Sequence, residues 1–329
     1  MGIERRIFGL YFPGYFVARY TRKYLSSNMG YILMYHEVMP DDIATPAWTV
    51  VKETNFRWQI EFLKRNYDIV TLDEAEARLT SKESSNRPFV SITFDDGYYG
   101  NLNTVLPIMQ SMDAPFSVYV ATRAIQEQKL YWYDEIINFL KSKTVINYQV
   151  KEGNSHRTFT IPAKGTDNQR WIAVQKLLTW LKTLPEKERH QEVARILKKY
   201  PPVKPDLRML TQSELQELAS DPLVTIGCHT HGHELLDQLA DDTVIETIMT
   251  ANKLIEAWTG TRPYHFSYPN GNFDERISNF IKDFRFRTAV TTQPRLCRLK
   301  DNLFTLPRLG VGRFDLKNHF KAKMAGLSL

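Results

Sequence analysis

Hydrophobic residues recur along the first part of this chain in two alternating patterns. Apolar residues spaced three and four apart predict amphipathic helices over residues 55–65 and 102–109. Short apolar runs, rich in β-branched and aromatic residues, predict buried strands over 31–36, 67–72, 89–94 and 116–120. Strands that alternate with helices are typical of a parallel sheet, so this pattern predicts an α/β fold.

The alternation returns in the last third of the chain. Thr211 with Glu214, and Thr243 with Glu246, form capping-box patterns that predict two helix starts. Gly260 is expected to end the second of these helices. Further apolar runs predict strands over 223–226, 264–268, 287–292 and 304–309.

Residues 129–210 interrupt this alternation. Their pattern predicts a hairpin over 147–161, helices over 169–184 and 186–199, and an extended proline-rich link at 201–205. We therefore expect a mostly helical insertion (129–210) in a main domain of residues 29–312, followed by a basic tail, 313–329. The insertion is either a structural appendage or a lid that forms one wall of a substrate site.

The first 28 residues combine basic and aromatic side chains. Five basic residues less Glu4 give a formal charge of +4, from Arg5, Arg6, Arg19, Arg22 and Lys23. Pro13-Gly14 and Arg19 interrupt the apolar run, so we expect neither a signal peptide nor a membrane span here. Two hypotheses remain: an arm packed on the domain, or a peripheral anchor on anionic lipid.

Composition narrows the class of protein. A chain of 329 residues with 43% hydrophobic and 24% charged residues is typical of a globular protein with a large core. The formal net charge of +6 suits several anionic partners, but no basic run with interleaved aromatics favours nucleic acid. Cys228 and Cys297 lie in apolar contexts and are expected to be buried free thiols.

Two of the predicted strands lead into residues that bind metals. The run 89–94 is followed by Asp95-Asp96-Gly97, and the run 223–226 leads to His229-Thr230-His231-Gly232-His233. Adjacent buried carboxylates are costly without a cation, although the first motif alone is typical of a simple turn. A helical turn would place His229 and His233 on one face. Together the motifs predict a divalent-metal site of the catalytic type, with positions left open for water.

Thr93-Phe94-Asp95-Asp96-Gly97 and the motif from His229 to His233 resemble those of the polysaccharide deacetylase family, the NodB-homology domain of carbohydrate esterase family 4. The resemblance covers about residues 30–310 and implies a distorted (β/α) barrel of about seven parallel strands. It also implies metal-dependent hydrolysis of N-acetyl groups on an amino sugar of a polysaccharide, oligosaccharide or lipid-linked glycan. By motif, Asp95 resembles the general base, and Asp96, His229 and His233 resemble the metal ligands.

The sequence departs from the family pattern at the residue that usually holds the base. Ser267 replaces that arginine in the stretch Phe266-Ser267-Tyr268-Pro269-Asn270-Gly271, and Arg308 is our candidate substitute. Tyr268 and Asn270 are candidates for substrate contact and for a backbone N–H that stabilises an oxyanion.

A second departure concerns the general acid. The family's late Leu-x-x-His motif is absent, because His319 is the only histidine beyond residue 290. Met34-Tyr35-His36-Glu37-Val38 is similar to a permuted subgroup in which an N-terminal Tyr-His motif supplies this histidine. His36 is therefore expected to be the general acid.

The resemblance leaves alternatives open. An O-deacetylase or a deformylase of a related sugar would use the same site, whereas a glycan-binding protein or a zinc-stabilised scaffold would keep the fold without turnover. The predicted ligands favour zinc and also suit cobalt, nickel or manganese. We expect a cytoplasmic location, with peripheral contact at the inner face of the membrane through residues 1–28 as one hypothesis.

Overall fold

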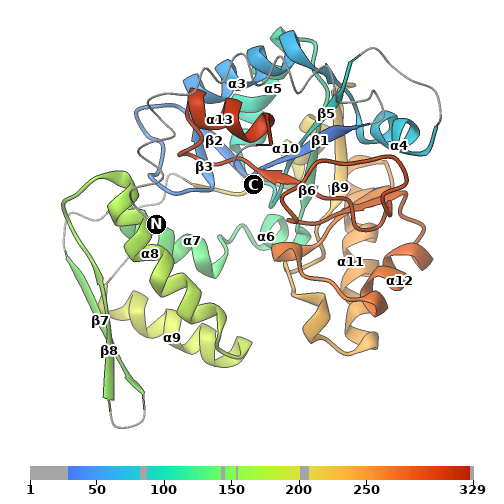
Figure 1. Ribbon diagram of the computed structural model, residues 1–329. Coiled ribbons are helices and arrows are strands. Elements are labelled where there is room, and N and C mark those ends of the chain that lie inside the picture. The colour runs from blue at the N-terminus through green and yellow to red at the C-terminus, as the bar shows by residue number, and fades with distance from the viewer. Residues whose placement is uncertain (1–28, 82–86, 142–144, 153–154, 201–206, 327–329) are drawn as a thin grey trace.

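A computed structural model describes residues 29–81, 87–141, 145–152, 155–200 and 207–326 (Figure 1). The predicted arm at 1–28 and the proline-rich link at 201–205 lie outside the described residues. Within the described ranges, no helix combines the length and the apolar character needed to cross a bilayer.

A curled sheet of parallel strands forms the centre of the molecule. Its strands are β1 (Gly30–Tyr35), β4 (Asp68–Ile69), β5 (Phe89–Phe94), β6 (Phe116–Val120), β9 (Val224–Cys228), β10 (His265–Ser267), β11 (Thr288–Val290) and β12 (Leu309–Gly310). Seven of them follow the order β11-β10-β9-β6-β5-β1-β12, and β4 pairs with the start of β5. The prediction of an α/β fold with a distorted barrel of about seven parallel strands is confirmed.

Residues 306–310 connect the two edges of this sheet. Leu306 forms a parallel bridge with Val290 of β11, and Leu309 pairs with Leu33 of β1. Arg308 lies between these two pairings. One short, late segment therefore curls the sheet toward a closed barrel and also places Arg308 among the strand ends.

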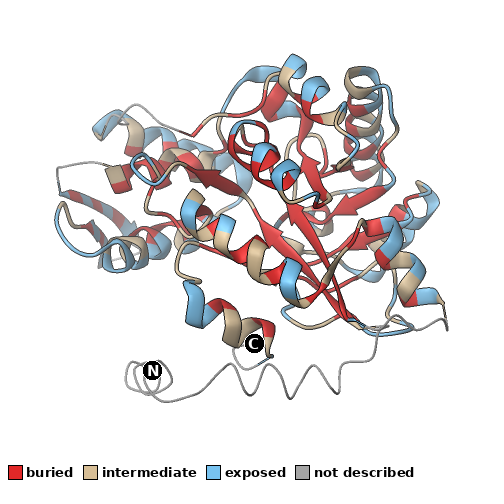
Figure 2. Ribbon diagram, turned by 90° about the horizontal axis from the view of Figure 1, so that it is seen from above, coloured by how far each residue is buried: buried red, intermediate tan, exposed pale blue. Residues whose placement is uncertain are grey.

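Helices surround the sheet: α3 (Glu53–Asn66), α4 (Leu72–Thr80), α5 (Leu106–Ser111), α6 (Thr122–Glu127), α10 (Gln212–Ala219), α11 (Asp241–Thr259), α12 (Glu275–Asp283) and α13 (Lys317–Met324). A separate small sheet pairs β2 (Glu37–Met39) with β3 (Val50–Lys52). Figure 2 shows the central strands buried along their length, whereas the helices are buried on one side only. In α13, Phe320 and Met324 are buried and the helix packs against α3, so part of the expected tail belongs to the main core.

Local capping explains where several helices begin. Thr71 and Glu74 form a capping box that starts α4, so the predicted strand 67–72 shrinks to Asp68–Ile69. The predicted box at Thr211 does cap α10. By contrast, α11 starts at Asp241 rather than Thr243, because acidic residues already favour that end of the helix.

The insertion forms a lobe beside the barrel (Figure 1). Its described elements are α7 (Trp132–Ile137), β7 (Ile146–Glu152), β8 (Ser155–Ile161), α8 (Asp167–Lys182) and α9 (Glu186–Lys199). Leu177, Leu181 and Ile196 belong to an apolar cluster that these elements bury together. In Figure 1, α7 lies between this lobe and α6 of the barrel, so the start of the insertion reaches the face that carries the strand ends.

Candidate active site

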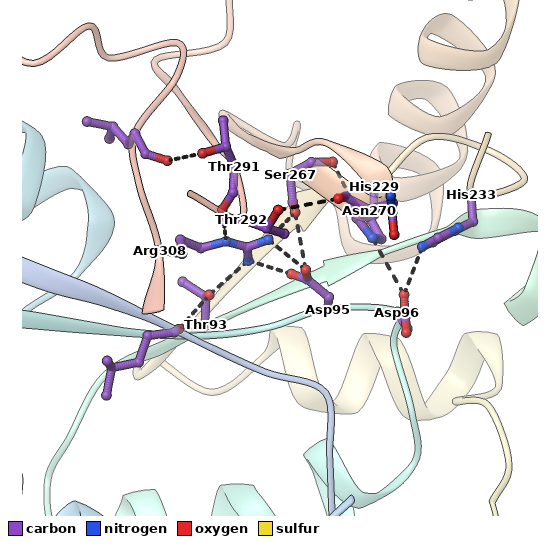
Figure 3. A network of polar contacts seen from close by, with 12 residues as sticks. Thr93, Asp95, Asp96, His229, His233, Ser267, Asn270, Thr291, Thr292 and Arg308 are labelled. Atoms are coloured by element: carbon purple, nitrogen blue, oxygen red, sulfur yellow. Dashed lines mark hydrogen bonds and ion pairs between the residues drawn. The ribbon is translucent and has the colours of Figure 1, made fainter. Parts of the chain in front are cut away.

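The carboxyl ends of four parallel strands supply the candidate side chains. His36 follows β1, Asp95 and Asp96 follow β5, His229 follows β9, and Ser267 ends β10. Parallel strands present these ends at one edge of the sheet, which is where barrels of this kind carry their sites. Figure 3 shows Asp95 directed toward Arg308, and Asp96 directed toward the imidazoles of His229 and His233.

Asp95 is held by a buried arginine. Arg308 Nη1 donates to Asp95 Oδ1 and Nη2 to Oδ2, both at 2.7 Å, in a two-pronged ion pair. The other three N–H groups of this guanidinium donate to the Thr291 carbonyl at 3.0 Å, the Thr93 hydroxyl at 3.1 Å and the Ser267 hydroxyl at 2.8 Å. All five donors of Arg308 are thus used, and its side chain is fully buried.

This environment keeps Asp95 ionised. Burial alone would raise the pKa of the Asp95 carboxyl, but the charge of Arg308, with a smaller contribution from His229, holds that pKa below its usual range. Ser267, the residue that stands where the family has an arginine, also donates to Asp95 Oδ2 at 3.4 Å. Ser267 therefore contacts both the carboxylate and the arginine that holds it.

Asp96, His229 and His233 form a second, separate cluster. Asp96 Oδ1 lies 3.5 Å from His229 Nε2 and 3.4 Å from His233 Nε2. The ligand atoms of the three residues all lie within 4.8 Å of one another. Asp96 Oδ1 is buried and has no hydrogen-bond partner among the described residues.

The donor set of this cluster fits a divalent metal ion. His229 Nδ1 lies 2.7 Å from the Ser267 carbonyl oxygen, which can only accept, so Nδ1 carries a proton and Nε2 is the ring nitrogen that faces the cluster. Burial lowers the pKa of His233 to about 4, which leaves its imidazole neutral at pH 7. The Nε2 atoms of His229 and His233 and a carboxylate oxygen without a partner are the kinds of ligand atom that a catalytic zinc site uses.

The backbone around this cluster is not helical. The four-residue spacing of His229 and His233 suggested a helical turn, but Thr230 and His233 have left-handed φ angles of 64° and 60°. Asp96 is also left-handed, with φ 80°, and Gly97 follows at 84°. These consecutive left-handed residues turn Asp96 away from Asp95, and aspartate and glycine tolerate this conformation better than most residues.

Two tyrosines from the insertion complete the wall beside Asp96. The Tyr133 hydroxyl donates to Asp96 Oδ2 at 3.2 Å, and the Tyr131 hydroxyl donates to the Asp96 carbonyl at 3.0 Å. Their rings stack on each other and both contact the His233 ring. The sequence reasoning assigned neither tyrosine a role, because nothing in their spacing reveals that α7 returns to the barrel face.

His36 lies close enough to the acidic pair to be influenced by its charge. Burial lowers the pKa of the His36 imidazole, whereas Asp96 and Asp95 act against this shift. Its ring packs edge-on against Trp48, and its Nδ1 is buried without a hydrogen-bond partner among the described residues. The neighbouring Glu37 does not pair with it, because the Glu37 carboxylate accepts from the N–H groups of Val38 and Gly100.

Asn270 lies at the site, but Tyr268 does not. Asn270 is left-handed, with φ 57°, in the turn that follows β10. The expectation for Tyr268 needs correction, because its ring is buried against Phe266 and Phe273. Its hydroxyl donates to the Phe304 carbonyl and its N–H to that of Val290, which leaves neither group for a substrate.

The comparisons with known proteins agree with this geometry. The family model for polysaccharide deacetylase matches residues 82–289, more than half of the chain. The chain belongs to the polysaccharide deacetylase family. Asp95, Asp96, His229 and His233 lie inside the matched range of this deacetylase, whereas His36 and Arg308 lie outside it.

Solved structures show the same fold at low sequence identity. A Streptococcus pyogenes deacetylase, PplD, in complex with acetate is 16% identical with a TM-score of 0.60, covering 90% of this deacetylase and 98% of PplD. IcaB from Ammonifex degensii is 15% identical with a TM-score of 0.58, over 91% and 97% of the two chains. A de-N-acetylase from Aggregatibacter actinomycetemcomitans is 14% identical with a TM-score of 0.53, over 90% and 99%. A comparison with curated protein sequences gave no match.

These findings confirm the predicted family, the predicted enzyme class and the general activity, deacetylation of a glycan.

Proposed function

We propose that this deacetylase removes N-acetyl groups from an amino sugar of a glycan in a metal-dependent hydrolysis. One observation carries the proposal: an ionised carboxylate, Asp95, is held rigidly beside a carboxylate–imidazole cluster in which Asp96 Oδ1 lacks a partner. A base and an adjacent metal site are what the hydrolysis of an unreactive amide needs. The acetate in the PplD structure and the name of the Aggregatibacter de-N-acetylase support this reaction by analogy.

Asp96, His229 and His233 would hold the metal, with zinc favoured and cobalt, nickel or manganese also suited to these ligands. When bound, such an ion polarises a carbonyl and lowers the pKa of water to about 7. Tyr133 and the Ser267 carbonyl keep the Asp96 carboxylate and the His229 ring in place, as supporting groups around metal ligands commonly do.

Asp95 is proposed as the general base. Its lowered pKa means that it is ready to accept a proton from the attacking water, and Arg308 fixes both of its oxygens. Arg308 is a positioning residue in this scheme, because its five donors are used within the protein and none remains for a substrate. The backbone N–H of Asn270 is the candidate donor to the oxyanion that forms on the acetyl carbonyl.

His36 is proposed as the general acid that protonates the departing sugar amine. Its unpaired Nδ1 and its electrostatic coupling to Asp95 and Asp96 support this role. Protonation of the amine lets the C–N bond break as acetate forms. General acid catalysis typically contributes about 10²–10⁴-fold in rate.

Acetate release from a panel of glycans tests this function. The protein, loaded with zinc or cobalt, is incubated with N-acetylated and O-acetylated oligosaccharides of matched length, and Asp95→Asn protein serves as the control. We expect release from the N-acetylated substrates, and no release by the variant. Release from O-acetylated substrates alone would overturn the proposed amide specificity, and equal release by Asp95→Asn would overturn the assignment of the base.

A further inference from the structure

Two basic residues of the insertion lie beside the site but take no part in the chemistry proposed above. Lys182 is the last residue of α8 and Arg189 lies in the first turns of α9, so the short turn 183–185 brings them together. Lys182 Nζ donates to Asn270 Oδ1 at 3.1 Å. The insertion therefore extends a cation onto the barrel face, where the charge of Asp96 also acts on it.

Arg189 is connected to the same site through aromatic residues. Its guanidinium carbon lies 5.2 Å from the ring centre of Trp132, an arrangement that favours a cation over the ring face. Trp132 contacts the ring of Tyr133 edge-on at 5.7 Å, and the Tyr133 hydroxyl reaches Asp96. Arg189 is thus connected to Asp96, a proposed metal ligand, through the side chains of Trp132 and Tyr133.

One donor of the Arg189 guanidinium lacks an acceptor. Its Nε is buried and has no hydrogen-bond partner within the described ranges, whereas the residue as a whole is partly exposed. The nearby charge of Glu186 acts on it without forming a contact. A buried donor without an acceptor is unfavourable, and the like charge of Lys182 adds repulsion. Arg308, by contrast, uses every donor within the protein.

We propose that Lys182 and Arg189 form a subsite for an oxyanion, phosphate or carboxylate, carried by the glycan whose acetylated sugar occupies the site. This rests on the proposed function and narrows its substrate class to anionic glycans. Lys182 keeps two N–H donors after its bond to Asn270, and Arg189 offers a planar fork that lies over the Trp132 ring. A group bound here would screen the two cations from each other and supply the missing acceptor.

Binding to the Asp95→Asn variant, loaded with zinc, tests this subsite without turnover. The probes are N-acetylglucosamine, N-acetylglucosamine 1-phosphate, and a hyaluronan tetrasaccharide compared with neutral N-acetylchitotetraose, each measured by titration calorimetry. We expect at least one anionic sugar to bind about tenfold more tightly than its neutral counterpart at low salt, and this preference to shrink at high salt. The phosphate and carboxylate probes show which oxyanion is preferred.

Charge variants decide whether the preference comes from this subsite. Arg189→Gln and Lys182→Gln should reduce the ratio of anionic to neutral affinity about tenfold, and Arg189→Lys should restore part of it. Lys176→Gln and Lys198→Gln remove the same charge from exposed positions of α8 and α9 and should leave the ratio unchanged. Equal affinity for anionic and neutral sugars, or an equal loss in the control variants, would overturn the subsite. If no acetate is released but the Arg189-dependent preference for anionic sugars persists, the proposed reaction is overturned and the subsite is not.

Discussion

Asp95 and Asp96 are neighbours in sequence and both are buried, yet their surroundings are opposite. Asp95 has its charge neutralised by Arg308 and both oxygens bonded, so this half of the site is complete within the protein. Asp96 faces two imidazoles across a distance of 3.4–3.5 Å and has one oxygen without a partner. This difference is what the proposed function requires, with Asp95 as the fixed base and Asp96 as a ligand of a metal ion.

The largest expected effect comes from removing the metal from the cluster of Asp96, His229 and His233. His229→Ala removes a ligand and the group that links Asp96 to the Ser267 carbonyl, so metal content and activity should both be lost. Treatment with a chelator should have the same effect and should lower the melting temperature, because a ligand that binds only the folded state stabilises it. Asp95→Asn should abolish turnover yet retain the metal. Metal analysis beside acetate release checks this contrast, which fails if the two variants lose metal equally.

Arg308→Met removes the ion pair that holds Asp95. Removing one partner of a buried ion pair typically costs about 3–5 kcal/mol of unfolding free energy, because the remaining charge is uncompensated. Arg308→Lys should lose less, since it keeps the charge but not the two-pronged geometry. Denaturant unfolding measures both variants. A loss below about 1 kcal/mol in Arg308→Met would contradict the description of this pair as buried and strongly coupled.

The same variant should reverse the effect of pH on stability. In the native protein the pKa of Asp95 lies below its unfolded value, so the pair stabilises the fold above pH of about 4 and this contribution is lost as pH falls through the folded pKa. Without Arg308, burial raises the pKa of Asp95 instead, and stability should fall as pH rises above the unfolded pKa of about 4. The double variant Asp95→Asn/Arg308→Met should not show this fall in stability with rising pH. Unfolding curves at several pH values measure it.

His36→Ala tests whether the site needs a residue outside the range matched by the family. Loss of a general acid should lower kcat at least about a hundredfold while metal content stays constant, because no bond in the structure ties His36 to the ligands. His319→Ala, on the exposed side of α13, is the matched control and should retain activity. Near-normal activity of His36→Ala would refute its proposed role.

Tyr133→Phe should have the smallest effect. It removes the hydroxyl that donates to Asp96 Oδ2 but keeps the ring stacked on Tyr131. Groups that orient metal ligands typically contribute about 10–100-fold in affinity, and we expect the lower end for one 3.2 Å bond. Equilibrium dialysis measures the affinity of each variant for zinc. Tyr148→Phe, whose hydroxyl contacts Glu192 within the insertion, is the control, and a shared loss would mean that the insertion acts only through general stability.

The parts of the site that follow directly from local sequence could be predicted. Each of the two motifs follows an apolar run. Such a run predicts a strand, and the residues that come next lie at the carboxyl end of that strand. Tyr268 was misplaced because successive residues of an extended segment point to opposite sides. Ser267 faces Arg308, so Tyr268 must face the core.

Other features depend on packing between distant segments. Tyr133 and Lys182 reach the site only because the apolar cluster of the insertion holds α7 and α8 against the barrel face, which no periodicity reveals. Arg308 was named from its place after an apolar run, but its five bonds require β5, β10 and β11 to be assembled around it. Local patterns thus predicted the positions of Asp95, Asp96, His229 and His233 better than those of the groups that surround them.

The bond between Asp95 and Arg308 joins residues that are 213 positions apart. During synthesis at about 5–20 residues per second, Arg308 leaves the ribosome roughly 10–40 seconds after Asp95. Until then the carboxylate has no counter-charge and the sheet edges at β1 and β11 are not connected. Catalytic competence is therefore expected to arrive with the last step of assembly, so a nascent chain would carry the motifs of a deacetylase without acting as one.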